Sequence, residues 1–322
     1  MIRVEKVKAV AYPTIPVVFV SSVRDNRWPL HDTMGLAVTD LKEQTRTETT
    51  VEKTSSGKLD SFIVGKEKLP EERTMSVSEV LKIFQKESGK NFGIKVESTN
   101  YAIYSGSSDA GAAALVVALN ELFETNFPIG KIAELGMMVS ESAIRAIYGG
   151  LNIMVVEGIG APYGKQLASE KDLKDLRIFA MGFDYPTRVS AEQIFQLTRA
   201  NTFYEYRLKM VPQWIAKIKL GLLDKDWNLV FSVAEENCSN AHYLIESSGK
   251  RCRKKEMMNA VIDVEEIRES GLPVYWTAGG GKVINAISWG KEAEKVLAEL
   301  KKRGQKPIEY KVAPGAKVIE KK

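Results

Sequence analysis

Seven residues at 105–111, SGSSDAG, have the composition of a phosphate-binding loop. Gly106 and Gly111 let the backbone approach a ligand closely, and hydroxyls and exposed N–H groups at the start of a helix favour an anion. An apolar run with helical spacing follows at 112–122, so the same residues also suit an ordinary turn before a buried helix. The segment matches neither the P-loop nor the dinucleotide-binding glycine pattern. Taken alone, the loop leaves both interpretations open.

The side chains available for catalysis are limited by type. Two histidines, His31 and His242, argue against a His-rich metal centre and leave few candidates for a catalytic triad. Two cysteines, Cys238 and Cys252, lack the spacing of metal ligands and are expected to be free thiols. Any catalysis must therefore rest mainly on carboxylates, basic residues, hydroxyls and backbone dipoles.

Composition and charge limit the class of protein and of partner. The 322 residues are 44% hydrophobic and 27% charged, as in a soluble globular protein. No apolar run reaches the roughly 18 residues of a membrane span, and charges interrupt the N-terminus, so we expect a cytoplasmic protein that binds no membrane. The net charge of +5 suits an anionic small molecule such as a nucleotide. The basic clusters are more typical of solvated faces than of nucleic-acid sites, so no nucleic-acid partner is expected.

The first half of the chain is expected to be β-rich and then mixed. Apolar runs and a Thr-rich alternation predict strands at 15–20, 35–38, 45–54, 62–64 and 92–98. One helix is expected near 77–85. A helix follows the loop, and a second is expected to begin at Pro128 and continue to Gly149. Buried strands are expected at 151–158 and 176–184.

Helical periodicity dominates from about residue 190, and alternation returns near the C-terminus. A strand, a Gly-rich turn at 278–281 and a second strand are expected there, followed by a helix and a last strand. This order predicts an α+β fold with a β-rich N-terminal lobe, a mixed C-terminal lobe and a central cleft. We place the two domains at 1–183 and 184–322.

Four segments, in this order along the chain, resemble the GHMP kinase superfamily. They are SGSSDAGAAALVVAL at 105–119, SESAIRAIYGGL at 140–151, FDYPTRVSAEQI at 183–194 and YWTAGGGKVINAI at 275–287. The nearer match is the mevalonate diphosphate decarboxylase branch, and the resemblance extends from AYPTIPVVF near the N-terminus to the AGGG turn. It implies a GHMP-kinase-like fold in both lobes, a Gly/Ser loop over nucleotide phosphates, and an acid-binding pocket lined by the second segment.

Two departures from that branch concern its reaction. Its decarboxylases carry a lysine in a K-Y-W-G-K-type segment and an aspartate before the Gly-rich turn, whereas here AYPTIPVVFVSSVRD has no lysine and Thr277 precedes the turn. Loss of phosphate and CO2 passes through a cation-like species that needs a fixed polar environment, but phosphoryl transfer depends mainly on positioning. The pattern is similar to the mevalonate 3-kinases of acidophilic archaea. It implies phosphorylation of the tertiary 3-hydroxyl of mevalonate by ATP, without decarboxylation, in an archaeal isoprenoid pathway.

The resemblance also implies roles for residues of the loop. Its backbone N–H groups and hydroxyls would hold the phosphates of ATP, with Mg²⁺ bridging them; these residues are Ser105, Gly106, Ser107, Ser108, Ala110 and Gly111. Ser108 is the expected ligand of the metal, and Ser107 is expected to contact the substrate as well. Asp109 is left without a role beyond that of a helix-start residue.

Four further residues complete the implied site. Glu141 would accept a hydrogen bond from the primary hydroxyl of mevalonate, although it also suits an ordinary polar helix position. Arg188 would bind the mevalonate carboxylate bidentately. Arg145 lies four residues after Glu141, so an ion pair along one helix face competes with a ligand role. Thr277 could donate its hydroxyl near the reacting oxygen but is too weakly basic to act as a general base.

Two alternatives stay open at this point. The first is a lyase that decarboxylates mevalonate 3,5-bisphosphate without ATP, because its leaving group is already installed. The second is a non-catalytic relative that binds a phosphorylated metabolite. The resemblance further implies a homodimer.

Overall fold

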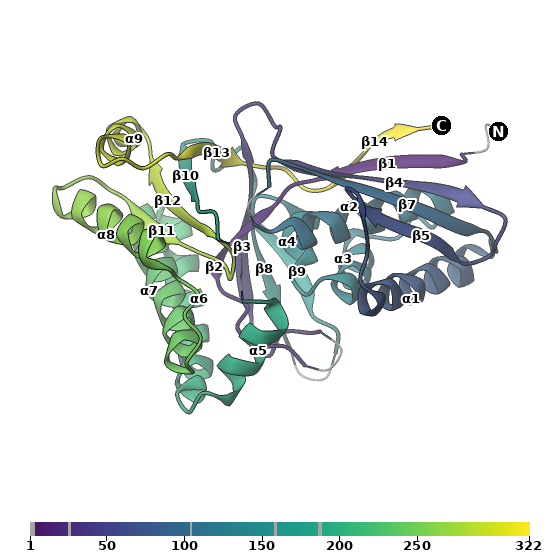
Figure 1. Ribbon diagram of the computed structural model, residues 1–322, viewed down its shortest axis with the longest axis horizontal. Coiled ribbons are helices and arrows are strands. Elements are labelled where there is room, and N and C mark those ends of the chain that lie inside the picture. The colour runs from purple at the N-terminus through teal and green to yellow at the C-terminus, as the bar shows by residue number, and fades with distance from the viewer. Residues whose placement is uncertain (1–3, 25–26, 104, 158–159, 186–188) are drawn as a thin grey trace.

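The computed structural model describes residues 4–24, 27–103, 105–157, 160–185 and 189–322. Two β-sheets form its framework (Figure 1). The first has the strand order β14 (Lys317–Lys321), β1 (Lys6–Ala11), β4 (Arg46–Thr54), β7 (Gly93–Tyr101), β5 (Leu59–Val64) and β6 (Glu67–Lys68). In β4 buried and less buried residues alternate, because one face of this sheet packs on helices, and this confirms the strand that the Thr-rich alternation predicts.

The second sheet joins both halves of the chain. Its order is β11 (Tyr275–Thr277), β12 (Val283–Trp289), β10 (Leu176–Gly182), β13 (Ile308–Val312), β3 (Thr33–Asp40), β8 (Leu151–Val155) and β9 (Tyr163–Ala168), and β2 (Thr14–Val18) pairs with β3. The end of the chain thus returns to sheets begun in its first half, since β13 pairs with β3 and β14 with β1. The division at 183/184 remains our proposal.

Helices α1 (Glu71–Ser88) and α2 (Ser107–Phe123) pack on the first sheet, and α3 (Ile129–Val139) and α4 (Ala143–Tyr148) pack beside α2 and contact strands of the second sheet. The apolar run after the Gly/Ser loop forms α2, which has more buried residues than α1, α3 or α4 and packs on β1, β4 and α4. Because nine of the thirteen residues from Ala110 to Leu122 are buried and none is exposed, packing fixes the position of this helix and of its N-terminus.

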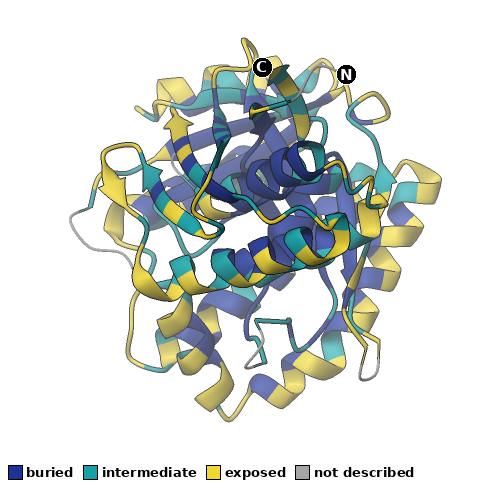
Figure 2. Ribbon diagram, turned by 90° about the vertical axis from the view of Figure 1, so that its right-hand side faces the viewer, coloured by how far each residue is buried: buried dark blue, intermediate teal, exposed yellow. Residues whose placement is uncertain are grey.

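The described second half of the chain contains five further helices: α5 (Ala191–Ala200), α6 (Tyr204–Asp224), α7 (Trp227–Ser247), α8 (Lys255–Glu269) and α9 (Glu292–Lys302). Helices α6 to α9 gather at the other end of the molecule from α1, around β10, β11 and β12 (Figure 1), whereas α5 lies nearer the middle, with Glu192 3.4 Å from Arg73 of α1. Buried residues are concentrated in the interior, and exposed residues lie on the outward faces of the peripheral helices (Figure 2). The mixed, two-lobed fold expected from the sequence is confirmed.

The helix expected from Pro128 to Gly149 is wrong as a single element. α3 ends at Val139, and α4 begins only at Ala143. Ser140 between them is extended, with φ −145° and ψ 124°, and its hydroxyl donates to Asp109 instead of remaining on a helix face. Serine side chains that bond elsewhere compete with the helical conformation, so Glu141 lies in a turn between two helices.

Two smaller expectations can be compared with the structure directly. Cys238 and Cys252 are free thiols, as expected. Within the described ranges, no helix combines the length and apolar character needed to cross a bilayer.

Candidate active site

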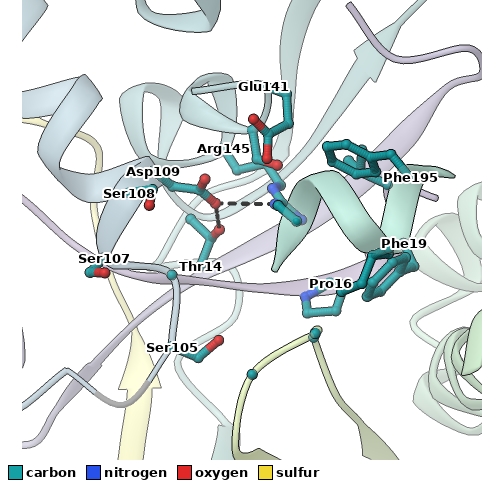
Figure 3. A pocket seen from close by; sticks show the side chains of 18 of the residues that line it. Thr14, Pro16, Phe19, Ser105, Ser107, Ser108, Asp109, Glu141, Arg145 and Phe195 are labelled. Atoms are coloured by element: carbon teal, nitrogen blue, oxygen red, sulfur yellow. Dashed lines mark hydrogen bonds and ion pairs between the residues drawn. The ribbon is translucent and has the colours of Figure 1, made fainter. Parts of the chain in front are cut away.

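A pocket opens where the two lobes meet, and residues of all four segments singled out in the sequence line it (Figure 3). The Gly/Ser loop lines one side, and the Gly-rich turn at 279–281 faces it. A Cβ placed on Gly279 would lie 3.6 Å from Ser105 Oγ, so loop and turn are in near contact. Phe19, Ile194 and Phe195 supply an apolar wall.

The loop ends at the N-terminus of α2, where it has the geometry of an anion site. Gly106 is the N-cap, with φ 77° and ψ 15°, and no side chain caps the helix. The free N–H groups of the first turn and the hydroxyls of Ser107 and Ser108 therefore adjoin the pocket, which both serines line. Ala110 is fully buried, and Gly111 lines a neighbouring cavity instead of this pocket.

We predict that Gly106→Ala will weaken ATP binding at least about tenfold. The left-handed conformation costs a non-glycine residue about 1–2 kcal/mol, and a Cβ here would lie 2.8 Å from both the N and O atoms of Thr14. The loop must therefore shift away from β2. The measurement is KM for ATP together with Tm. Gly130→Ala is the matched control, because a Cβ at Gly130 meets nothing within 4 Å; equal behaviour of the two variants would contradict this account of the loop.

Asp109 lines the pocket, although we expected no role for it beyond that of a helix-start residue. Its Oδ2 accepts from Thr14 Oγ1 at 2.6 Å and from Arg145 Nη2 at 3.1 Å, and its Oδ1 accepts from Ser140 Oγ at 3.1 Å. Thr14, Asp109 and Arg145 point toward one another in Figure 3. Burial raises the pKa of Asp109, and the Arg145 charge and the two hydroxyls oppose that shift.

Arg145 is bound to Asp109, not to Glu141. Its aliphatic stem packs directly on Gly35, where a Cβ would lie 2.0 Å from Arg145 Cδ. This close contact requires glycine at position 35 and fixes the guanidinium beside Asp109. The ion pair that the four-residue spacing predicts is absent from the described structure, because Glu141 precedes α4 instead of sharing its face.

Glu141 lines the pocket, and its carboxylate forms an ion pair with an arginine that is distant in sequence. Arg27 Nη2 donates to Glu141 Oε2 at 2.9 Å, and both side chains are largely buried. Arg27 carried no signal in the sequence, because its partner lies 114 residues away. Asp109 did carry a signal in the sequence, because a carboxylate inside a phosphate-binding loop repels the ligand unless a cation neutralises it.

Thr277 lies beside the pocket, next to the Gly-rich turn. It is buried, and its hydroxyl donates to the backbone carbonyl of Pro16 at 2.7 Å, which ties β11 to β2. Its proton is therefore committed to the protein, and Pro16, not Thr277, lines the pocket. Arg188 lies outside the described residues.

A second cavity adjoins the first and shares Ser107 and Ser108 with it. Its walls are apolar at Phe62, Val64 and Leu69 and polar at Ser98 and Asn100; these belong to β5, β7 and the approach to α1. The N-terminus of α2 thus lies between two pockets, each lined by both charged and apolar residues.

The described residues include no group of three or more His, Cys, Asp or Glu side chains placed to hold a metal ion. Mg²⁺ is commonly bound by one or two protein oxygens together with substrate phosphates, and it keeps several waters. The hydroxyl of Ser108 at the phosphate loop fits that mode of binding.

Comparisons with known proteins agree with this arrangement. Residues 11–158 match the family model described as the diphosphomevalonate decarboxylase-like N-terminal domain. A mevalonate 3-kinase of Thermoplasma acidophilum is 28% identical over 311 residues, which are 95% of each chain. A mevalonate-3-kinase of Picrophilus torridus is 28% identical over 303 residues, 91% of each chain.

A solved structure gives the fold independently. The crystal structure of the Thermoplasma acidophilum mevalonate-3-kinase with mevalonate 3-phosphate and ADP bound matches with a TM-score of 0.88 and 24% identity, over 99% of this chain and 100% of that one. The expected resemblance is therefore confirmed: this chain has the fold of the mevalonate 3-kinases and is similar to them in sequence along nearly its whole length.

Proposed function

We propose that this protein is a small-molecule kinase that transfers the γ-phosphoryl group of ATP to the tertiary 3-hydroxyl of mevalonate. The product is mevalonate 3-phosphate, and no CO2 is released. One observation carries the proposal: the uncapped N-terminus of α2 opens into a pocket whose acidic and basic groups suit a small hydroxy acid. The similarity to mevalonate 3-kinases over nearly the whole chain supports the same substrate.

The nucleotide would lie across the N-terminus of α2. Its β- and γ-phosphates would accept hydrogen bonds from the backbone and hydroxyls of the loop, and its base would enter the cavity of Phe62, Val64 and Leu69. Ser108 would hold Mg²⁺ together with the phosphates. When bound, the ion neutralises developing phosphate charge and orients the γ-phosphoryl group.

Mevalonate would lie in the pocket between the loop and Glu141. Glu141 would accept from its primary hydroxyl, and Arg188 would bind its carboxylate; these two residues fix the ends of the substrate, so the tertiary hydroxyl faces the phosphates. Asp109 and Arg145 form the floor. Phosphoryl transfer has a loose transition state that needs little help from a base, so positioning accounts for most of the catalysis.

The same contacts explain why the reaction would stop at the phosphate ester. Phe19 and Val20 line the wall formed by the AYPTIPVVFVSSVRD segment, in which the decarboxylase lysine is missing. The Thr277 hydroxyl is held by Pro16 and carries no charge. A cation-like intermediate would therefore lack the carboxylate and the lysine that the branch's decarboxylases supply. We assign Thr277 a positioning role at the Gly-rich turn.

The test is ADP release by the purified protein with ATP, Mg²⁺ and mevalonate. The proposal predicts turnover that depends on mevalonate, and no CO2 from mevalonate 3,5-bisphosphate without ATP. CO2 in that second reaction, with no ADP in the first, would establish the lyase instead. We further propose a cytoplasmic homodimer, to be checked by the molar mass in solution and by cell fractionation.

A further inference from the structure

Glu141 has one close cationic partner in the described structure. Arg27 Nη2 lies 2.9 Å from Glu141 Oε2, and the two side chains are 15% and 10% exposed. The other carboxylates near Arg27, those of Glu72 and Glu192, are both 3.4 Å away, and their side chains are 73% and 47% exposed. An ion pair that is largely removed from water is screened less than exposed pairs, so Glu141 is the dominant partner of Arg27.

Arg27 acts on the pocket through Glu141. Glu141 lines the pocket, whereas Arg27 is absent from the described residues that line it. The backbone of Arg27 has φ 63°, in the left-handed region that non-glycine residues rarely adopt. Burial lowers the pKa of Arg27, but the charges and hydrogen bonds of Glu141 and Glu192 outweigh burial and raise it overall. The unusual backbone and the buried pair together hold the guanidinium behind the carboxylate.

The charges around the pocket alternate in sign. Arg27 pairs with Glu141, and Arg145 pairs with Asp109; the Glu141 charge also raises the pKa of Asp109, which places the two carboxylates within electrostatic reach of each other. The four groups sum to zero charge. Without Arg27, two partly desolvated carboxylates would share one arginine, and the Glu141 side chain would lose the contact that holds it in place.

The pairing also affects which substrate the site accepts. An ionised carboxylate has no donor, so at this position it can accept from a hydroxyl but repels a phosphate oxygen. We infer that Arg27 is a positioning residue that holds Glu141 as an acceptor for the primary hydroxyl, so that the pocket selects mevalonate over mevalonate 5-phosphate. This inference rests on the proposed function and names the residue that sets its specificity.

The first test separates positioning from general stability. Arg27→Gln should raise KM for mevalonate about tenfold and leave kcat and KM for ATP within about twofold, and Arg27→Lys should restore part of the loss. Arg268→Gln is the matched control: Arg268 forms a 2.8 Å pair with the mostly buried Glu235, and neither residue lines the pocket. If Arg27→Gln and Arg268→Gln have the same KM for mevalonate and similar Tm values, the inference is overturned.

The second test uses a double-mutant cycle with two substrates. Glu141→Gln removes the repelling charge and frees Arg27 for a phosphate, so kcat/KM for mevalonate 5-phosphate relative to mevalonate should rise at least about tenfold. In the double variant Arg27→Gln/Glu141→Gln most of that gain should disappear. A gain that persists without Arg27, or no gain in Glu141→Gln, contradicts the inference; near-wild-type Tm values exclude misfolding as the cause.

The wild-type enzyme distinguishes failure of the inference from failure of the proposed function. Turnover of mevalonate by the wild-type protein, with Arg27→Gln indistinguishable from Arg268→Gln, overturns the inference alone. A wild-type protein that does not turn over mevalonate with ATP overturns the proposed function and the inference with it.

Discussion

Asp109→Asn is expected to lower kcat about 100- to 1,000-fold, the loss typical of removing one preorganised electrostatic contact at a reacting centre. The carboxylate joins β2, α2, the turn after α3 and α4, through Thr14, Ser140 and Arg145. Asparagine has nearly the same shape but carries no charge. The variant would leave the Arg145 guanidinium buried without a counter-charge at the floor of the pocket.

The same change should lower the stability of the fold. Removing one partner of a buried ion pair typically costs about 3–5 kcal/mol. The amide oxygen of asparagine can still accept hydrogen bonds, so the loss of stability here should be smaller than that. The measurements are kcat with mevalonate and the free energy of unfolding in urea. Asp226→Asn is the matched control, because Asp226 caps α7 by accepting from Leu229 N at 3.1 Å, and asparagine caps a helix about equally well. If Asp109→Asn and Asp226→Asn have the same kcat and the same free energy of unfolding, the central role of Asp109 is contradicted.

Arg188→Ala should raise KM for mevalonate about 100-fold and change KM for ATP by less than about threefold. A 100-fold change corresponds to about 2.7 kcal/mol, within the range for a lost bidentate contact to a carboxylate. Arg145, which lines the pocket, is committed to Asp109, and Arg27 is committed to Glu141. The substrate carboxylate therefore needs a further cation, and we propose Arg188 for that role, as the sequence resemblance implies.

Steady-state kinetics with each substrate varied in turn measures this effect. Arg188→Lys should give an intermediate KM, because an ammonium group cannot reproduce the two parallel hydrogen bonds of a guanidinium. Arg199→Ala, an exposed position on α5, serves as the control. Equal losses for mevalonate and ATP would indicate that Arg188 supports the fold instead of the carboxylate.

The elements with strong periodicity could be predicted from the sequence. The apolar spacing after Gly111 gives α2, and the alternation at 45–54 gives β4. The strands β1, β9 and β14 have weaker signals because charged or polar residues occupy several of their positions. Helix α8 is not among the elements that we expect individually from the sequence, although its buried residues have helical spacing; they are Met257, Ala260, Val261, Val264 and Ile267.

The partners within the site could not be predicted, because they depend on contacts between distant segments. Asp109 reaches Thr14 over 95 residues and Arg145 over 36, and Arg27 reaches Glu141 over 114. The break at Ser140 has the same origin, since its hydroxyl leaves the helix to bond Asp109. Local spacing favoured an ion pair between Glu141 and Arg145, and the tertiary contacts replaced it with two separate pairs.

The most direct test of the central claim is the identity of the product. We would incubate the purified protein with ATP, Mg²⁺ and mevalonate, follow the reaction by phosphorus NMR, and trap CO2 in parallel. The account predicts ADP and a tertiary phosphate ester, with no CO2 above that of a reaction without enzyme. A primary phosphate ester would contradict the proposed placement of the substrate by Glu141 and Arg188, and stoichiometric CO2 would contradict the claim that this pocket phosphorylates without decarboxylating.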